Sequence, residues 1–283
     1  MKIVGVAESI QQTGKECAKK IFFKCDDQCM VEACLLNLKK HGTVICISNQ
    51  VGCSQACTFC AAGLAPFIRN LTLEEIVQQV DQIMERFPAF FEDRFEVTFM
   101  GSGEPLTNYE NVKSAIDFLA ANYASIRKIN ISTILPYLNR KLIDDFKQYR
   151  GRMHIQYSLH FVDDRKREEI FDRQLPPVQD SLTFLDELAE CLDDRYANNY
   201  ILFDKINDGE QDVRDLAQLL SEKRGYLKIS EMSSINKSKL QRSKNVERFI
   251  TDLKKYNIEY DFFESLGQDV SAGCGQFYNE SII

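Results

Sequence analysis

The chain has 283 residues, of which 44% are hydrophobic, and its formal net charge at pH 7 is −7. This length is enough for one large core, and no run of about 18 apolar residues predicts a transmembrane helix. The acidic balance argues against a protein that coats itself in nucleic acid, since such binding depends mainly on Lys and Arg neutralising phosphates. Ten cysteines without a signal peptide favour metal binding in a reducing compartment over disulfides. We therefore expect a soluble, cytoplasmic protein with no membrane partner.

The first 42 residues are interpreted as a small N-terminal extension. Two apolar runs, at 21–25 and 30–36, flank the polar turn Asp26-Asp-Gln and predict a β-hairpin. The rest of the chain contains no internal repeat and no Pro/Gly-rich linker. We place the only domain boundary near residue 42, which gives a hairpin extension at 1–42 and one domain at 43–283.

From residue 43 onward, apolar or β-branched runs alternate with amphipathic stretches, which is typical of repeated βα units around a parallel sheet. The sequence predicts strands at 43–49, 95–100, 127–133, 153–159, 198–204, 226–232 and 259–264, and helices at 73–87, 108–122, 138–149, 181–192, 210–223 and 243–256. Six such units can close partly into a barrel whose active site lies at the C-terminal ends of the strands. The expected fold class is α/β, a partial (β/α)6 barrel with a small N-terminal β-hairpin extension.

Three cysteines, Cys53, Cys57 and Cys60, follow the first predicted barrel strand. Three thiolates can ligate three irons of a four-iron cluster, which normally has four cysteine ligands. The fourth iron then stays open to a small-molecule chelate, for which the amino and carboxylate groups of S-adenosylmethionine (SAM) are the candidate. A structural zinc site is the alternative, but such sites usually draw four ligands from two separated pairs, and no second CxxC or HxxxH occurs here. The sequence therefore favours a [4Fe–4S] cluster.

A second element, Met100-Gly-Ser-Gly-Glu-Pro105, follows the next predicted strand. Glycines at a strand end let the backbone approach a ligand closely, and Glu104 can accept hydrogen bonds from an ammonium group. By itself this pattern is more often an ordinary turn. One βα unit after the cysteine loop, it becomes the expected clamp for the SAM amine.

Several motifs in one order give the chain a wider resemblance. They are the stretch from Cys46 to Cys60, then Asn70-Leu-Thr, Gly101-Ser-Gly-Glu-Pro-Leu, Ser158-Leu-His160, Asn207-Asp-Gly and Ala272-Gly-Cys274-Gly-Gln. Together they resemble the radical SAM methyltransferases RlmN and Cfr, from about residue 30 to the end of the chain. The resemblance implies a radical SAM barrel, a [4Fe–4S] cluster held by the three cysteines, and SAM as methyl donor and radical source.

The resemblance assigns catalytic roles to three further residues. In the family, the cysteine matching Cys274 is methylated by one SAM, and a 5′-deoxyadenosyl radical from a second SAM takes a hydrogen from the new S-methyl group, so that the methylene adds to an adenine carbon. Cys46 matches the cysteine that helps to remove the adenine proton and resolves the crosslink by forming a disulfide with the methyl carrier. Glu32 matches a glutamate that approaches the target base. Without the resemblance, Cys274 and Cys46 would be packing residues.

Further positions are implied to bind the cofactor. Gly103 and Glu104 match the amine-binding turn, and Ser132, Ser158, Leu159 and His160 match positions that contact the ribose, carboxylate or adenine of SAM. Asn236 is matched to an asparagine of a family segment from which the surrounding residues here depart. His154 has no motif behind it, and Cys17, Cys25, Cys29, Cys34 and Cys191 are expected to be packing residues.

The expected function is therefore radical methylation of an sp2 carbon, by resemblance adenine C2 in 23S ribosomal RNA or transfer RNA, with flavodoxin or ferredoxin as electron donor. Family members carry a helical N-terminal domain that helps to grip RNA, and the 45 residues before Cys46 are too few for it. The alternative is the same chemistry on a small molecule or nucleotide. The basic stretch at 236–244 is expected to be solvated surface, although it could hold phosphates. A cluster that only senses redox state or iron is the non-enzymatic alternative.

Overall fold

The computed structural model describes residues 1–10, 16–235 and 238–277. Its strands are β1 (Lys2–Glu8), β2 (Cys17–Lys24), β3 (Met30–Leu38), β4 (Gly42–Ile47), β5 (Gln50–Val51), β6 (Arg69–Asn70), β7 (Phe95–Phe99), β8 (Ile126–Thr133), β9 (Met153–Ser158), β10 (Ala197–Leu202), β11 (Tyr226–Glu231) and β12 (Tyr260–Phe263). Its α-helices are α1 (Leu73–Arg86), α2 (Tyr109–Asn122), α3 (Lys141–Phe146), α4 (Asp164–Phe171), α5 (Val178–Leu192), α6 (Glu210–Leu220) and α7 (Val246–Lys255). Short 3-10 turns occur at Pro88–Phe90, Pro105–Asn108, Lys147–Tyr149 and Gln268–Val270. None of these helices is long and apolar enough to cross a membrane.

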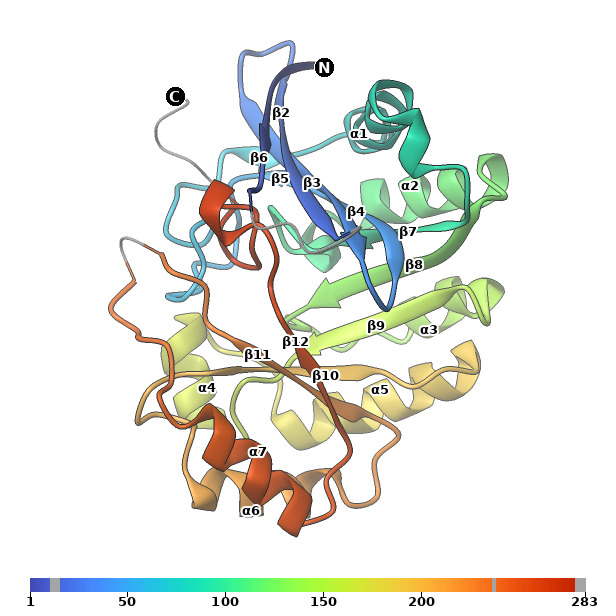
Figure 1. Cartoon of the computed structure of the whole chain (residues 1–283). Coiled ribbons are helices and arrows are strands. Elements are labelled where there is room, and N and C mark those ends of the chain that lie inside the picture. Colours follow the sequence, from blue (N-terminus) through green and yellow to red (C-terminus); the bar gives the residue numbers. More distant parts are fainter. Residues whose placement is uncertain (11–15, 236–237, 278–283) are drawn as a thin grey trace.

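One sheet carries ten of the described strands, in the order β1-β2-β3-β4-β7-β8-β9-β10-β11-β12. From β4 to β12 every neighbouring pair is parallel. Figure 1 shows these strands as a curved sheet with the helices along its outside. The fold is thus an α/β partial barrel, as the sequence predicts, because each strand is followed by a crossover that returns the chain in the same direction.

The N-terminal strands extend the same sheet. β2 and β3 form the predicted hairpin, and β1, which the sequence analysis did not anticipate, pairs antiparallel with β2. β3 pairs antiparallel with β4, so the hairpin joins the barrel directly. The domain boundary near residue 42 stays a prediction, since the sheet crosses that point without a break.

The elements follow the predicted ranges closely where an apolar pattern marked them. α1 begins with the predicted capping box, in which Thr72 and Glu75 each bond the other's backbone N–H. α4 was missed because Asp164-Arg-Lys-Arg-Glu-Glu-Ile-Phe171 is mostly charged, and only Arg167 and Phe171 on it are buried. Charged helices of this kind have no apolar stripe for the periodicity to reveal.

Polar side chains line part of the interior of the barrel, although its strands look apolar. On β8, Ile129 and Ile131 belong to the main core, whereas Asn130 and Ser132 line the cavity inside the barrel. The same alternation places Cys46 and Thr98 in the cavity lining from β4 and β7. Side chains alternate between the two faces of a strand. The side chains on one face therefore pack under the helices, and those on the other face line the cavity.

Candidate active site

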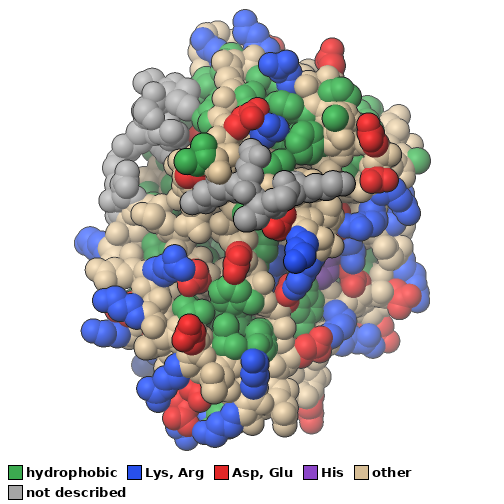
Figure 2. Space-filling model, viewed as in Figure 1, with side chains coloured by type: hydrophobic (Ala, Val, Ile, Leu, Met, Phe, Trp, Pro, Cys, Tyr) green, Lys and Arg blue, Asp and Glu red, His purple; other side chains and the backbone are tan. Residues whose placement is uncertain are grey.

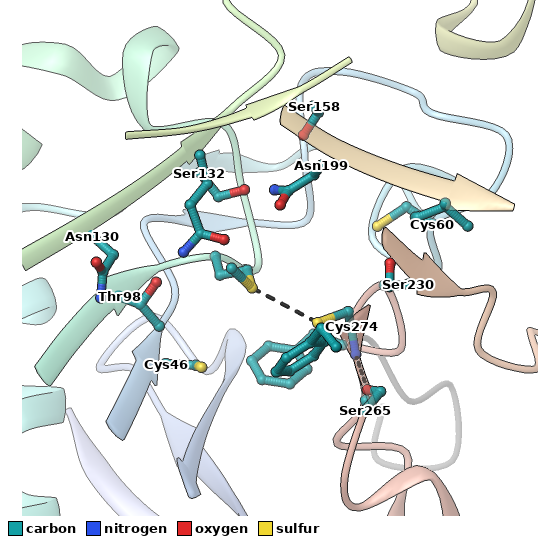
Figure 3. A pocket seen from close by; sticks show the side chains of 18 of the residues that line it. Cys46, Cys60, Thr98, Asn130, Ser132, Ser158, Asn199, Ser230, Ser265 and Cys274 are labelled. Carbon is teal, nitrogen blue, oxygen red and sulfur yellow. Dashed lines mark hydrogen bonds between the residues drawn. The ribbon is translucent and has the colours of Figure 1, made fainter. Parts of the chain in front are cut away.

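One cavity, inside the barrel and at the C-terminal ends of its strands, gathers the five cysteines that the sequence analysis selected. Cys46, Cys53, Cys57, Cys60 and Cys274 all line it. They come from the end of β4, the loop between β5 and β6, and the segment after β12. Figure 3 shows Cys46, Cys60 and Cys274 around this space. Residues 228 positions apart in sequence therefore meet at the place where barrel enzymes carry their chemistry.

The cysteine loop is compact, and its backbone is tied to the C-terminal segment. A Cβ on Gly63 would lie 2.5 Å from the backbone nitrogen of Cys57, so only glycine permits this approach. The N–H groups of Gly63 and Leu64 both donate to the carbonyl oxygen of Cys60, at 3.0 Å. Ala61 N–H donates to the carbonyl oxygen of Gly275 at 2.7 Å, which holds the residue after Cys274 against the loop.

The donor set of this loop fits an iron–sulfur cluster. Burial raises the pKa of Cys53 to about 12 and raises the pKa values of Cys57 and Cys60, so the thiols are neutral until a metal displaces their protons. Within residues 1–10, 16–235 and 238–277, no three His, Cys, Asp or Glu side chains converge on a single metal position. In a four-iron cluster each of the three thiolates would bind a different iron.

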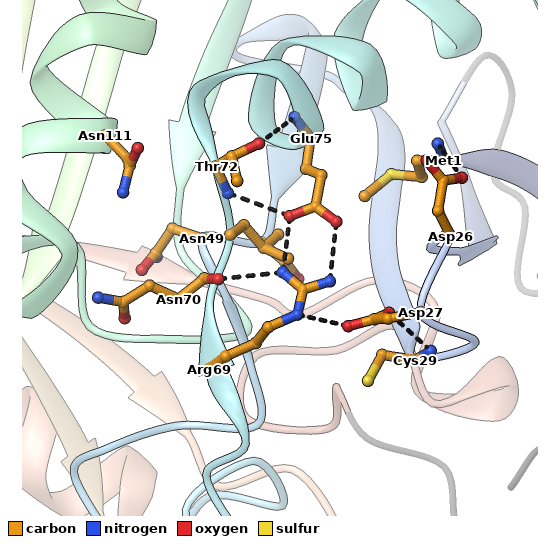
Figure 4. A network of polar contacts seen from close by, with 12 residues as sticks. Met1, Asp26, Asp27, Cys29, Asn49, Arg69, Asn70, Thr72, Glu75 and Asn111 are labelled. Atoms are coloured by element: carbon orange, nitrogen blue, oxygen red, sulfur yellow. Dashed lines mark hydrogen bonds and ion pairs between the residues drawn. The ribbon is translucent and has the colours of Figure 1, made fainter.

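Arg69 on β6, just after this loop, forms ion pairs with two carboxylates. Its guanidinium donates to both carboxylate oxygens of Glu75 on α1, at 2.7 and 2.8 Å, and to Asp27 in the β2–β3 turn at 2.6 Å. Figure 4 shows this network, which joins the hairpin, β6 and the start of α1. A bidentate arginine–carboxylate pair has fixed geometry. The C-terminal end of the cysteine loop is therefore attached to a rigid part of the fold.

Glu104 is a buried carboxylate held in one orientation. It is 4% exposed, and its oxygens accept hydrogen bonds from the hydroxyl of Thr133 at 2.6 Å and from the backbone N–H groups of Ile134 and Leu106 at 3.0 Å. Burial raises its pKa to about 7, against the effect of these donors. A Cβ on Gly103 would lie 2.7 Å from Oδ1 of Asn49. The turn therefore packs tightly and presents Glu104 to the cavity that it lines.

The other predicted cofactor residues differ in where they lie. Ser132, Ser158 and His160 line the cavity. His160 is 2% exposed, its Nδ1 accepts a hydrogen bond from Ile201 N–H, and burial lowers its pKa to about 3. Leu159 is fully buried in the main core and does not line the cavity. Asn236 lies outside the described residues.

Cys274 is held from two sides. Its N–H donates to the hydroxyl of Ser265 at 3.0 Å, and its sulfur lies 3.7 Å from the sulfur of Met100 at the end of β7. Burial raises the pKa of Cys274 and of Cys46, and the ammonium of Lys228 opposes the shift in both cases. Both thiols are therefore fixed in a cavity that disfavours their charged form.

Glu32 is placed differently from Cys46 and Cys274. It lies on β3, 7% exposed, and pairs with the ammonium of Lys20 at 2.9 Å. Lys20 is fully buried and also donates to the carbonyl oxygen of Ser271 at 2.9 Å. Glu32 does not line the cavity. Through Lys20 it instead connects the hairpin to the segment that carries Cys274.

The structure adds cavity residues that the sequence analysis did not select, among them Thr98, Gln156 and Lys228. A signal for Lys228 was present, because a lysine in the middle of Tyr226-Leu-Lys-Ile-Ser-Glu231 interrupts a central parallel strand. Such strands are normally almost continuously apolar. That it lines the same cavity as the two catalytic candidates depends on how the sheet curves into a barrel.

Comparison with known proteins identifies the family. The model of the radical SAM superfamily matches residues 47–220. The probable dual-specificity RNA methyltransferase RlmN of Spiroplasma citri is 28% identical over 97% of this chain and 80% of its own length. The protein of the same name from Clostridium botulinum (strain Eklund 17B / Type B) is 32% identical over 95% of this chain and 77% of its own.

Solved structures agree with this assignment. A radical SAM methyltransferase from Sphaerobacter thermophilus superposes with a TM-score of 0.84 at 25% identity, covering 97% of this chain and 80% of that one. Streptococcus suis SuiB bound to S-adenosylmethionine shares the fold, with a TM-score of 0.60 at 12% identity over 82% of this chain and 55% of that one. An enzyme assignment replaces the sensor alternative. The chain is a SAM-dependent methyltransferase with a [4Fe–4S] cluster, and it belongs to the RlmN family of the radical SAM superfamily.

Proposed function

We propose that this enzyme methylates an sp2 carbon of RNA, namely C2 of an adenine in 23S ribosomal RNA or transfer RNA, through a methyl group carried by Cys274. The observation that supports it best is that Cys46 and Cys274 line the same cavity as the three cysteines of the loop. Relatives of which this chain spans 80% and 77% are named as dual-specificity RNA methyltransferases. A carbon of this kind has no lone pair with which to attack a sulfonium methyl directly, so a radical route through a protein thiol suits it.

The cofactor residues follow from the geometry of the cavity. Cys53, Cys57 and Cys60 would hold the cluster, and Glu104, with Gly103 beside it, would bind the SAM amine. When bound, cluster and SAM supply a methyl group and a 5′-deoxyadenosyl radical. The carboxylate of Glu104 is already oriented by Thr133 and Ile134, so little reorganisation accompanies binding.

The remaining steps fall to the two other cysteines. Cys274 loses its proton and accepts the methyl group at its sulfur, while Ser265 and Met100 keep that sulfur in place. After the new carbon–carbon bond forms, the radical adduct must give up one electron, which would return to the oxidised cluster, and Cys46 takes part in removing the adenine proton. The sulfur of Cys46 then bonds to the sulfur of Cys274, the bond from that sulfur to the methylene carbon breaks, and this carbon takes up a proton to complete the methyl group, which releases the RNA and leaves a disulfide. Glu32, paired with Lys20, would support the segment that carries Cys274.

Recognition of RNA rests on local charge, because the net charge is −7. Figure 2 shows Lys and Arg interspersed with Asp and Glu over the face in view. Lys239, Arg242 and Lys244, after β11, are the described cations of the basic stretch noted in the sequence. We place the enzyme in the cytoplasm with flavodoxin or ferredoxin as electron donor.

The test is incubation of reconstituted enzyme with unmodified ribosomal and transfer RNA and methyl-labelled SAM. We expect label in RNA, formation of 5′-deoxyadenosine, and a methylene-sized mass gain on the peptide that holds Cys274. Cys274→Ala should lose the label in RNA and keep the iron content. Label that stays off RNA despite formation of 5′-deoxyadenosine would point instead to a small molecule or nucleotide as substrate.

A further inference from the structure

The middle of the barrel contains polar residues to which the cofactor and the two catalytic cysteines give no role. Thr98, Asn130, Gln156, Asn199 and Lys228 all line the cavity. The sheet register sets Thr98 beside Cys46 on one side and Asn130 on the other, and sets Asn199 beside Lys228. Figure 3 shows Cys46, Thr98 and Asn130 together, with Cys274 facing them across the cavity.

Thr98 has an unused hydrogen-bonding group. Its side chain is 3% exposed, and its hydroxyl has no partner in the described part of the chain. Buried hydroxyls are normally paired because an unpaired one is costly. Its position in the cavity lining therefore points to a polar group of a bound molecule.

Lys228 places a buried cation in the same region. Its ammonium donates to Oε1 of Gln156 at 2.8 Å and lies 4.8 Å from the centre of the Phe263 ring. An ammonium has three donors, so the bond to Gln156 uses one and leaves capacity for a ligand. Burial lowers the pKa of Lys228, and the carboxylates of Asp261 and Glu96 and the thiols of Cys274 and Cys46 oppose this shift.

This set of side chains matches what recognition of a nucleobase requires. Enzymes that modify a base take it out of the stack and bind its edge by hydrogen bonds inside a pocket. Amide side chains suit adenine because they offer a donor and an acceptor together, and Asn130, Gln156 and Asn199 line the cavity. Asn130 already donates to Glu96 at 2.9 Å and Gln156 already accepts from Lys228 at 2.8 Å, so each of these two offers a base its other polar atom. The neighbouring Cys46 and Cys274 are the groups that the target carbon must reach.

We propose that this polar interior is the site for the target base and that Lys228 donates a hydrogen bond to a ring nitrogen next to the methylated carbon. The inference rests on the proposed function. Carbon C2 of adenine lies between N1 and N3, so an ammonium on either nitrogen draws electron density away from C2. The carbon then accepts an electron-rich methylene more readily, and the charge is already in place before the reaction.

The first experiment compares Lys228→Met with the unchanged enzyme on the same RNA. We expect methylation of RNA to fall about 10- to 100-fold, which is the value of a hydrogen bond from a charged donor. Iron content, formation of 5′-deoxyadenosine and the mass gain on the Cys274 peptide should stay unchanged. Lys40→Met is the matched control, because Lys40 is exposed and pairs with Asp261 near the start of β12, and all four readouts should stay unchanged.

The second experiment changes the substrate instead of the protein and compares the unchanged enzyme with Lys228→Met. RNA carrying 1-deazaadenine or 3-deazaadenine at the target position lacks one of the two ring nitrogens. Each analogue also makes C2 less electrophilic in both enzymes, so the fall in rate from adenine to one of these substrates should be about 10- to 100-fold larger for the unchanged enzyme than for Lys228→Met. An equal fall in rate for the two enzymes on both analogues would overturn the inference.

Two outcomes separate this inference from the function on which it rests. If Lys228→Met also abolishes the mass gain on Cys274, Lys228 serves the cofactor or the thiol and the inference is wrong. If the unchanged enzyme shows no mass gain on Cys274, the proposed function itself has failed.

Discussion

Cys34 on β3 lies directly opposite Cys46 on β4 in the antiparallel pair that joins the hairpin to the barrel. The two belong to one buried cluster with Ala272, two residues before Cys274. Cys34 was expected to be a packing residue, and no spacing rule connected it to Cys46. Cys34 is buried in this apolar cluster, as a packing residue would be, and it also places a third thiol opposite Cys46.

Oxidation should reveal this pairing. Residues directly opposite each other on antiparallel strands have Cα atoms about 4.5–5.5 Å apart, which lies within the range of disulfides. In Cys274→Ala, treatment with diamide should therefore link Cys34 to Cys46. Peptide mass spectrometry without reduction measures the product, and Cys34→Ala in the same background is the control. Recovery of Cys46 as a free thiol after complete reaction would contradict the pairing.

Gly63→Ala should reduce the iron content of the reconstituted enzyme. The new Cβ would lie 2.5 and 2.6 Å from the backbone nitrogen and oxygen of Cys57, so the loop must shift one of the proposed iron ligands. Gly151→Ala serves as control, because a Cβ there meets nothing within 4 Å, although its positive φ adds local strain. Iron and sulfide analysis, with the absorbance of the cluster, checks the result. Full iron content in Gly63→Ala would show that the loop tolerates the shift.

Glu104→Gln should weaken SAM binding about 10- to 100-fold, since a neutral amide replaces a charge-assisted acceptor of the amine. The amide keeps the size of the side chain and can still accept from Ile134 N–H. Iron content should therefore remain normal. Equilibrium dialysis with labelled SAM measures the effect, and Glu110→Gln, exposed on α2, is the control. Unchanged affinity would remove Glu104 from the proposed cofactor site.

Arg167 positions Glu104 indirectly, through Ile134. Its guanidinium donates to the carbonyl oxygens of Ile134 at 2.9 Å and of Ser158 and Leu159 at 3.3 Å. Ile134 N–H in turn donates to Glu104. Arg167 thus fixes the ends of β8 and β9, where the proposed cofactor residues begin.

Arg167→Met should lower the free energy of unfolding by about 3 kcal/mol, because buried carbonyl groups lose their donor. SAM affinity should fall as well, since Ile134 is no longer fixed. Arg165→Met, exposed on the same helix, should change neither quantity. Urea unfolding and SAM binding are the measurements. A stable variant with weakened SAM binding would still support the positioning of Glu104, whereas unchanged values of both would contradict the role of Arg167.

The sequence was enough to predict the strands of the barrel, but it predicted few of the contacts inside the barrel. The seven parallel strands were marked by apolar runs, and the cysteine loop by its spacing. The pairing of Cys34 with Cys46 and of Lys228 with Asn199 depends on strand register, which long-range pairing sets. Glu32 was assigned by resemblance alone, and its ion pair with Lys20 depends on how β2 and β3 align. Local patterns carry no information on such contacts between distant segments.

The clamp of Arg69 on Asp27 and Glu75 should make stability depend on acid. The hydrogen bond from Arg69 lowers the pKa of Asp27 to about 2, and Arg69 lowers the pKa of Glu75 although burial acts in the opposite direction. Groups with a lowered pKa stabilise the fold above their unfolded pKa of about 4, and this contribution is lost as pH falls toward the folded value. The pairs are partly exposed, so their total contribution at pH 6 is about 1 kcal/mol.

Arg69→Met should therefore be less stable than the unchanged protein by about 1 kcal/mol at pH 6, and the difference should shrink as pH falls from about 4 toward 2. Urea unfolding at low salt across this range measures it, and the difference at pH 6 should also shrink in high salt, which screens exposed pairs. Arg94 is exposed just before β7. The difference in free energy of unfolding between Arg94→Met and the unchanged protein should not change with pH. A difference for Arg69→Met that stays constant down to pH 2 would mean that Arg69 stabilises the loop by packing of its side chain, because only the ionic part of its contribution disappears when Asp27 and Glu75 are protonated.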